Sequence, residues 1–382
     1  MSSEAVVIIG SGLAGYNVAR ELRKLDAQVP IVVISRDHAG FYSKPMLSNA
    51  LAGKKTAATL VMKAAEKMAA EVQADVRAHT EVRRIDPAAR TIQLASGEVL
   101  PYRDLVLATG ADPIRIALEG DATDKVLSVN DLDDFALFAE ALDTAAAGQP
   151  AKRVAILGAG LIGCEFANDL LARQIEPTVV DLADRVLNRL LPAQASARLQ
   201  AQLEAAGARF RFGVGLQRVD QQAHGSGLLL TLSDGSTLEA DLVLSAIGLR
   251  PRTHLAAEAG LTINRGVVVN RELATSAPHV YAVGDCAEVD GLNLPYVLPL
   301  MTQARALAAT LTGKPTAVSY PAMPVVVKTP ALPTVICTPP MGAQGEWQVT
   351  DSEEALEARF ADATDPARLL GFVLQGKAVS QR

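Results

Sequence analysis

Two glycine-rich turns carry the most specific chemistry in the sequence, because both match the pattern Gly-x-Gly-x-x-Gly. One runs from Gly10 to Gly15 and the other from Gly158 to Gly163. In this pattern the first glycines allow a tight turn and a close approach of the backbone to a pyrophosphate, and the third lets a helix pack against a strand. Two copies therefore predict two dinucleotide-binding sites in one chain.

The elements on either side of each turn are those that such a site requires. Apolar strands are expected at 6–9 and 154–157, and helical stretches at 16–25 and 164–171. The first turn of each helix presents unpaired backbone N–H groups to the phosphates. Because the pattern occurs twice in the required context, packing alone is a poor explanation of the two turns.

A longer repeat surrounds the two turns. Each copy ends with a turn dipeptide and a buried strand, at 96–110 and again at 234–248. A predicted helix at 131–146 and a Gly-Gln-Pro link at 148–150 precede the second copy. After that copy, the sequence predicts strands and turns and then a helix from Pro299 to Leu311. This order predicts an α/β protein with two Rossmann-like domains and a small mixed α+β domain at the C-terminal end.

The acidic residue after the second strand of each copy decides which dinucleotide is bound. Asp181 lies about 20 residues beyond Gly160, where a carboxylate binds the adenosine ribose and repels a 2′-phosphate. This position predicts NADH rather than NADPH. In the first copy the strand ends at Ser35, before Arg36 and Asp37, and all three are candidates for the ribose contact.

The cysteines and histidines argue against several kinds of site. Cys164, Cys286 and Cys337 lie far apart in the sequence, so no dithiol can relay electrons to a disulfide substrate. We interpret them as buried structural residues, although Cys164 and Cys286 stand at predicted helix starts, where a thiol pKa can be lowered. The five histidines show no metal-ligand spacing, and we predict no metal site.

The composition excludes two classes of partner. A formal net charge of −6 and a pI near 5.5 provide no basic surface for nucleic acid. No stretch reaches the roughly 18 apolar residues that span a bilayer, and the N-terminal residues do not resemble a secretory leader. We therefore expect a cytoplasmic protein without membrane insertion.

Three segments resemble a known family. Ala-Thr-Gly at 108–110, Val-Tyr-Ala-Val-Gly-Asp at 280–285 and Phe-Tyr-Ser-Lys-Pro-Met-Leu-Ser at 41–48 resemble the FAD-dependent pyridine nucleotide oxidoreductases with two dinucleotide-binding domains. Lys44 stands where the subgroup serving rubredoxins and ferredoxins usually has Arg, and Asn49 where it often has Lys. These departures change the expected placement of charge near the flavin.

Within this family, segments 161–170, 284–291 and 327–330 resemble the rubredoxin reductases of alkane-degrading bacteria. The resemblance implies a glutathione-reductase-like fold, FAD in the first Rossmann-like domain and NADH in the second. It further implies that electrons pass from NADH through the flavin to the one-electron carrier rubredoxin, for alkane hydroxylation. The predicted domains are an FAD-binding domain at 1–112 and 248–320, an NADH-binding domain at 113–247 and a C-terminal domain at 321–382.

The resemblance assigns catalytic roles to three residues. Glu165 is expected to pair with Lys44 beside the reactive edge of the flavin, and Lys328 to place a positive charge at its pyrimidine edge. From the residues alone, Glu165 could instead be an exposed helix residue. Its apolar neighbours Ile162 and Phe166 argue against that reading. Lys328 could equally be a surface lysine.

The resemblance also implies a set of cofactor-binding residues. Asp285 is expected on the ribityl chain of FAD, although an Asp at this position could instead cap a helix. The backbone around Val82 and Val297 is expected at the adenine and isoalloxazine ends. The full predicted set is Gly10, Ser11, Gly12, Leu13, Ala14, Gly15, Ser35, Arg36, Lys44, Pro45, Val82, Thr109, Gly110, Gly158, Gly160, Leu161, Ile162, Gly163, Glu165, Asp181, Gly248, Asp285, Val297 and Lys328.

Three other activities stay open on the sequence alone. The chain could reduce a ferredoxin for an oxygenase, act as an NADH oxidase or peroxidase, or serve as a redox-sensing flavoprotein without enzymatic turnover. The interpretation of Cys164 and Cys286 as buried structural residues disfavours peroxide chemistry at a single cysteine. The electron acceptor that sustains turnover distinguishes the remaining possibilities.

Overall fold

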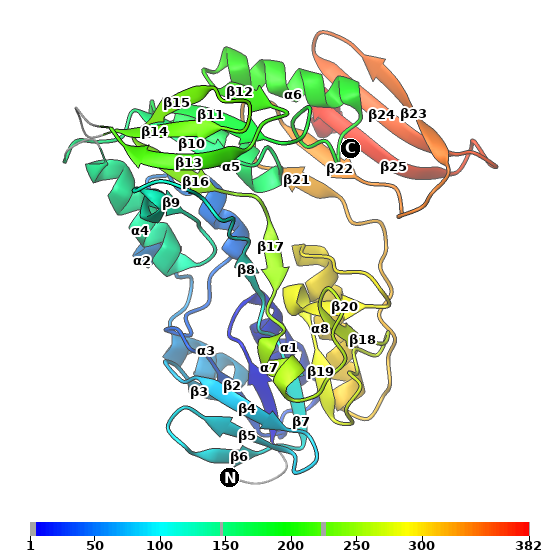
Figure 1. Cartoon of the computed structure of the whole chain (residues 1–382). Coiled ribbons are helices and arrows are strands. Elements are labelled where there is room, and N and C mark those ends of the chain that lie inside the picture. The colour runs from blue at the N-terminus through cyan, green and yellow to red at the C-terminus, as the bar shows by residue number, and fades with distance from the viewer. Residues whose placement is uncertain (1–4, 146–147, 223–226, 382) are drawn as a thin grey trace. The chain divides into compact units, whose positions relative to one another are not determined.

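The chain folds into two compact units, each containing a parallel sheet (Figure 1). The structure is a computed structural model and describes residues 5–145, 148–222 and 227–381. The last residue of the helix predicted at 131–146 lies outside this part of the chain. The first unit comprises residues 1–44, 58–112 and 249–321, and the second comprises 45–57, 113–248 and 322–382.

The first unit contains the N-terminal glycine turn. Its elements in chain order are β1 (Val6–Ile9), α1 (Leu13–Leu25), β2 (Ile31–Ile34), α3 (Ala65–Val72), β3 (Asp75–Arg77), β4 (Val82–Asp86), β5 (Thr91–Leu94), β6 (Val99–Pro101), β7 (Asp104–Leu107), β17 (Leu249–Pro251), α7 (His254–Glu258), β18 (Val267–Val269), β19 (Val280–Ala282), β20 (Ala287–Val289) and α8 (Val297–Leu311). Two further elements, α2 (Ala57–Leu60) and β8 (Ala111–Pro113), cross from one unit to the other along the chain.

The five-stranded parallel sheet of the first unit has the order β19-β7-β1-β2-β3. Strands β1, β2 and β7 are buried at every residue, as expected when both faces of a parallel sheet are covered. The residues of β1 lie opposite Ile31–Ile34 on one side and Asp104–Leu107 on the other, so the three strands end level with one another. The loops that follow them therefore meet at one edge of the sheet.

The second unit contains the other glycine turn and the C-terminal residues. Its elements are β9 (Val126–Leu127), α4 (Leu132–Thr144), β10 (Arg153–Leu157), α5 (Leu161–Leu171), β11 (Glu176–Asp181), α6 (Ala193–Ala205), β12 (Arg209–Phe212), β13 (Leu216–Gln221), β14 (Leu228–Leu232), β15 (Thr237–Ala240), β16 (Leu242–Ser245), β21 (Val325–Val327), β22 (Thr334–Cys337), β23 (Gly345–Asp351), β24 (Ala355–Asp362) and β25 (Leu369–Gly376).

The parallel sheet of this unit has the order β12-β11-β10-β16-β9, which matches the first unit in having the strand before the glycine turn at its centre. The two parallel sheets confirm the predicted α/β fold with two Rossmann-like halves. The boundaries of the three predicted domains stay a prediction.

The C-terminal residues form an antiparallel sheet with the order β21-β22-β25-β24-β23. Where the sequence predicted mixed α and β structure, the described residues form these strands and one short 3-10 helix at Lys377–Gln381. On this sheet the rings of Trp347 and Phe360 pack edge to face with centroids 5.4 Å apart. Aromatic packing of this kind stabilises a small sheet that has no covering helix of its own.

Local signals explain where several helices begin. The Asp131 carboxylate accepts a hydrogen bond from the backbone N–H of Asp134, which caps α4. Helix α8 begins at Val297, two residues before the predicted start. Pro299 thus lies in the first turn, where its missing N–H has no intrahelical partner to lose. None of the helices in the described part of the chain has both the length and the apolar character needed to cross a bilayer.

Candidate functional site

The first glycine turn has room for a phosphate group. Gly10 has a φ of +115°, and a Cβ atom there would lie 2.1 Å from the carbonyl oxygen of Ala108. A Cβ at Gly12, by contrast, would meet nothing within 4 Å. Gly12 is also the N-cap of α1, which has no capping side chain. Open space in front of uncapped N–H groups fits a pyrophosphate.

The second glycine turn repeats this geometry. A Cβ at Gly158 would lie 2.6 Å from the carbonyl oxygen of Ala246, whereas a Cβ at Gly160 would meet nothing within 4 Å. Helix α5 also begins without a capping side chain. Both turns therefore have the geometry that a dinucleotide site requires, each within its own unit.

A carboxylate lies beside the second turn. Asp181 ends β11, and its two oxygens accept the backbone N–H groups of Ala159 at 2.5 Å and Ala183 at 2.7 Å. Each carboxylate oxygen keeps a further lone pair that can accept a ribose hydroxyl. The structure thus brings Asp181 next to the turn that precedes α5, as the sequence predicted.

The first turn also has a carboxylate beside it, that of Asp37, but this residue is held by different partners. The hydroxyl of Ser35 lies 2.7 Å from that of Ser11 and donates to the Asp37 carboxylate at 2.6 Å. Burial alone would raise the pKa of Asp37, but hydrogen bonds from Ser35 and from the backbone N–H of Ala39 outweigh it and hold this pKa below its usual value. The side chain of Arg36 is 63% exposed, and its guanidinium lies 4.0 Å from the Asp112 carboxylate. Of the three candidate residues, Ser35 and Asp37 lie at the turn.

The strand end at Thr109 and Gly110 is held by a residue that sequence reasoning missed. Arg252 donates from its guanidinium to the carbonyl oxygen of Thr109 at 3.0 Å and to the Asp112 carboxylate at 2.6 Å. Its backbone N–H donates to the carbonyl oxygen of Gly110 at 2.9 Å. No local pattern marks Arg252, because its partners are far away in the sequence.

Asp285 follows β19 in a 3-10 helix at Gly284–Cys286 and is partly buried. Burial raises the pKa of this carboxyl group, and the positive charges of Lys44 and Arg252 oppose the rise. Val283, not Asp285, is the N-cap of the 3-10 helix, so the helix-capping alternative is wrong. The adjoining Gly284 N–H donates to the side chain of Gln303 on α8 at 2.7 Å.

The remaining predicted residues of the cofactor set stand at element ends. Val82 opens β4, and Val297 opens α8 with 38% of its surface exposed. Gly248 has a φ of +112° just before β17, a conformation that favours glycine. Their contacts with a cofactor stay predictions.

A polar cluster surrounds Glu165 on α5. This residue is fully buried, so the alternative of an exposed helix residue is wrong. Its oxygens accept the backbone N–H of Lys328 at 3.0 Å and the hydroxyl of Ser48 at 2.5 Å, and the Lys328 ammonium forms an ion pair with it. The Lys328 side chain is only 24% exposed, which does not fit a free surface lysine. Lys44 belongs to the other unit, and its predicted pairing with Glu165 stays a prediction.

Two further residues of α5 bind the segments that contain Ser48 and Lys328. The sequence analysis did not identify them. The Asp169 carboxylate accepts the backbone N–H groups of Leu51 and Ala52, both at 2.8 Å. The side-chain oxygen of Asn168 accepts the N–H of Ala331 at 3.0 Å. A usable signal was the spacing of Glu165, Asn168 and Asp169, which places three polar residues on one side of an otherwise apolar helix.

The cysteines fit the structural interpretation. All three are unpaired and buried, and burial raises the pKa of Cys164 and of Cys286. The thiols of these two residues donate to backbone carbonyl oxygens, that of Cys164 to Ala159 at 3.4 Å. Neither is an activated thiolate. The described residues also contain no group of side chains suited to hold a metal ion.

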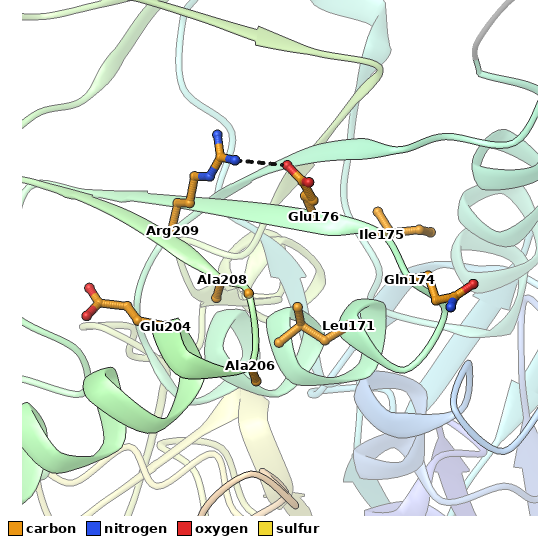
Figure 2. A pocket seen from close by; sticks show the side chains of 9 residues that line it. Leu171, Gln174, Ile175, Glu176, Glu204, Ala206, Ala208 and Arg209 are labelled. Carbon is orange, nitrogen blue, oxygen red and sulfur yellow. Dashed lines mark hydrogen bonds and ion pairs between the residues drawn. The ribbon is translucent and has the colours of Figure 1, made fainter.

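A surface hollow of about 540 Å³ lies at the opposite end of α5, as Figure 2 shows. The first residues of β11 and β12, Glu176 and Arg209, form an ion pair across it at 3.2 Å. Ligands of open parallel sheets bind beyond the carboxyl ends of the strands, and this hollow lies at their amino ends. Both charged side chains are more than half exposed, so we assign the hollow no role in binding.

The chain is similar to known proteins along almost its whole length. Residues 4–309 match the family described as pyridine nucleotide-disulphide oxidoreductase, and residues 317–382 match a rubredoxin binding C-terminal domain. Over 99% of its length the chain is 45% identical to the rubredoxin-NAD(+) reductase of Acinetobacter baylyi and 48% identical to that of Alcanivorax borkumensis, covering 95% and 96% of those proteins. Among solved structures, a ferredoxin reductase for the CYP199A2 system from Rhodopseudomonas palustris is 30% identical, with a TM-score of 0.87 over 97% of this chain and 91% of that one.

Proposed function

We infer the function from the family to which the chain belongs, the pyridine nucleotide-disulphide oxidoreductases. The protein is an FAD-dependent enzyme that oxidises NADH and reduces rubredoxin. The single observation that carries this conclusion is the match of residues 317–382 to a rubredoxin-binding domain, in a chain similar to rubredoxin-NAD(+) reductases along almost its whole length. The chemistry that FAD supplies when bound is acceptance of a hydride and release of single electrons.

The first glycine turn is proposed to hold FAD. The space beside Gly12 takes the pyrophosphate, and the cluster of Ser35 and Asp37 accepts the adenosine ribose hydroxyls. Asp285 would accept hydrogen bonds from the ribityl hydroxyls. Its carboxylate is less costly to keep charged in that place because Lys44 and Arg252 lie near enough to lower its pKa.

The second glycine turn is proposed to hold NADH. The space beside Gly160 takes the pyrophosphate, and Asp181 accepts the ribose hydroxyls. Because the Asp181 carboxylate is already held by two backbone N–H groups, it cannot turn away to make room for a 2′-phosphate. This restraint favours NADH over NADPH.

We propose that Lys328 holds the charged side chain of Glu165 in a single orientation on α5, the helix that follows the second glycine turn. Glu165 lies two residues beyond Gly163 and has no exposed surface, so its charge needs the partners that it has. The Ser48 hydroxyl and the Lys328 backbone N–H complete its hydrogen bonds. The pair thus anchors the segments that begin at Ser48 and Lys328 to α5.

We also propose a physiological setting. The resemblance of segments 161–170 and 327–330 to rubredoxin reductases of alkane-degrading bacteria suggests that the reduced rubredoxin serves alkane hydroxylation. Three unpaired, buried cysteines fit a reducing compartment and therefore the cytoplasm.

The proposal is tested with the purified protein, FAD and NADH. Reduction of a rubredoxin from an alkane-oxidising bacterium is compared with reduction of a plant-type ferredoxin at matched concentrations and salt. We expect rubredoxin to be reduced faster, with one FAD per chain and no titratable redox disulfide. Equal or faster reduction of ferredoxin would contradict the choice of acceptor. Negligible turnover with both carriers would favour a redox-sensing role instead.

A further inference from the structure

Helix α6 of the NADH-binding half lies beside the C-terminal sheet, and two of its residues bind that sheet (Figure 1). The carbonyl oxygen of Ala195 accepts a hydrogen bond from the side chain of Gln375 on β25 at 2.9 Å, and Gln375 is fully buried. One turn later, Arg198 binds the connection between β23 and β24. The two residues are three apart, so they lie on the same face of the helix.

Arg198 makes three contacts with three consecutive residues of that connection. Its guanidinium donates to the carboxylate of Asp351 and to the carbonyl oxygens of Ser352 and Glu353, the last at 2.7 Å. The side chain is 16% exposed. A planar guanidinium with fixed donor directions can bind such a turn in only one orientation, which a flexible ammonium group cannot enforce. Arg198 therefore determines how the β23–β24 hairpin is held.

The C-terminal sheet is bound to the NADH-binding half at two separate places. The entry to the sheet is bound to α5 through the contacts of Lys328 and Ala331. The contacts on α6 are made by residues 351–353 and 375, far along the chain from the entry. The orientation of the hairpin is therefore held by contacts other than those at the entry.

The contacts of Arg198 are separate from those that form the nucleotide site. The nucleotide turn is held by Asp181 at the end of β11 and by the start of α5, whereas the side-chain hydrogen bonds of Arg198 go to residues 351–353. Those residues lie within the segment that matches the rubredoxin-binding domain. A change at Arg198 should therefore alter the presentation of that domain while the NADH site stays intact.

We propose that Arg198 is a positioning residue for rubredoxin reduction, which fixes the rubredoxin-binding domain on helix α6 in the orientation that receives rubredoxin. The inference rests on the proposed function. Arg198 acts through the position of the hairpin and touches neither the nucleotide nor the reacting groups. Its effect is confined to turnover with the protein acceptor.

The test compares two electron acceptors in the holoenzyme with NADH as donor. Rubredoxin requires the docking domain, whereas ferricyanide, a small diffusible acceptor, does not. For Arg198→Gln we expect the KM for rubredoxin to rise about tenfold, equivalent to about 1.4 kcal/mol, because the hairpin is no longer held in one orientation. The kcat at saturating rubredoxin should change less than about twofold. The kinetic constants for NADH with ferricyanide should stay at the wild-type values.

Three further variants make the result specific. Arg198→Lys keeps a charge near Asp351 but not the planar set of donors, so it should restore the KM only in part. Asp351→Asn removes the negative charge from the other side of the contact but keeps an amide oxygen that can accept, so it should raise the KM less than Arg198→Gln. The matched control is Arg209→Gln, which removes an arginine whose side chain is 71% exposed from the same half of the unit and should change neither assay.

Each outcome decides the matter. A wild-type KM for rubredoxin in Arg198→Gln would overturn the inference, as would an equal loss of rubredoxin and ferricyanide turnover. If Arg198→Gln does not fold, Asp351→Asn decides in the same two assays. A wild-type enzyme that reduces ferricyanide but not rubredoxin would instead refute the proposed function.

Discussion

The two glycine turns have the same backbone geometry, but each obtains its neighbouring carboxylate in a different way. Beside the second turn, Asp181 ends its strand and is held by backbone N–H groups. Beside the first, Asp37 comes three residues after the end of β2 and is held by the Ser35 hydroxyl as well as by the backbone N–H of Ala39. A negative charge at the turn is thus reached from two sequence positions. The arrangement at the first turn depends in part on the Ser35 hydroxyl, which a single substitution can remove.

The helices that follow the two turns differ as well. Asn17 stands two residues past the third glycine of the first copy, and its side chain donates to the carbonyl oxygen of Leu13 within its own helix at 2.6 Å. Glu165 occupies the same place in the second copy and binds two other segments of the chain. At this position α1 makes a hydrogen bond within its own helix, whereas α5 binds the segments that contain Ser48 and Lys328.

The largest expected effect comes from filling the space at each turn. Gly12→Val should give a colourless protein after gentle purification, because the side chain occupies the phosphate position. Gly160→Val should stay yellow, with one FAD per chain, but show a KM for NADH raised at least about a hundredfold, the scale of two or more lost hydrogen bonds to a charged group. Flavin absorbance and steady-state kinetics check both results. Loss of FAD from Gly160→Val would reverse the assignment of the two turns.

A large effect on stability is expected on α5 alone. Lys328→Met leaves the buried Glu165 carboxylate without its cation, which should reduce the free energy of unfolding by about 3 kcal/mol, the lower end for a broken buried pair. The control on α1, Asn17→Ala, removes a single local hydrogen bond and should cost about 1 kcal/mol. Urea unfolding of the holoproteins measures both. Equal losses in the two variants would mean that the Glu165 pair is no more than a local contact.

A moderate effect is expected on the choice of nucleotide. Asp181→Ala should raise the KM for NADH by the equivalent of about 1.5–3 kcal/mol and weaken the preference for NADH over NADPH. Asp37→Ala should leave that preference unchanged, since its carboxylate belongs to the other turn. Initial rates with the two nucleotides are compared at one salt concentration. An unchanged preference in Asp181→Ala would show that another residue reads the ribose.

The smallest effect is a pH dependence at the first turn. The pKa of folded Asp37 lies below its usual value, so its charge stabilises the fold at pH values above the unfolded pKa of about 3.9. This stabilisation is lost as the pH falls through the folded-state pKa. Asp37→Asn should cost about 0.5–1.5 kcal/mol at neutral pH, and the difference from wild type should shrink below about pH 4. Unfolding curves of the apoproteins across this range check it; a difference independent of pH would mean that the charge contributes nothing.

Local patterns in the sequence predict much of this molecule. The glycine turns, the strands before them and Asp181 are all found within short segments, because each is defined by its own neighbours. Arg252 and Asp169 escape such reasoning, since their partners come from distant segments that the fold brings together. The partners of Glu165 show the same limit. The family resemblance implied Lys44, and the structure adds Lys328 and Ser48.

The start of α8 and the C-terminal sheet were less predictable for a different reason. A proline is tolerated anywhere in the first helical turn, so Pro299 does not determine that the helix starts at Val297. The C-terminal strands do alternate, as Leu356, Ala358 and Phe360 of β24 show, but the choice of pairing partner depends on contacts such as that of Trp347 with Phe360, which join separate strands. The sequence of one strand does not determine which other strand it pairs with.

The burial of Cys164, Cys286 and Cys337 makes the protein convenient for spectroscopy. A maleimide or nitroxide reagent finds no native thiol at the surface, so a cysteine introduced at exposed Ala88 or Ala367 would be the group that takes the probe. Doubly labelled molecules would then report the distance between the first unit and the C-terminal sheet by fluorescence transfer or pulsed electron resonance. Such distances could be followed during turnover in a chain that keeps all of its natural cysteines.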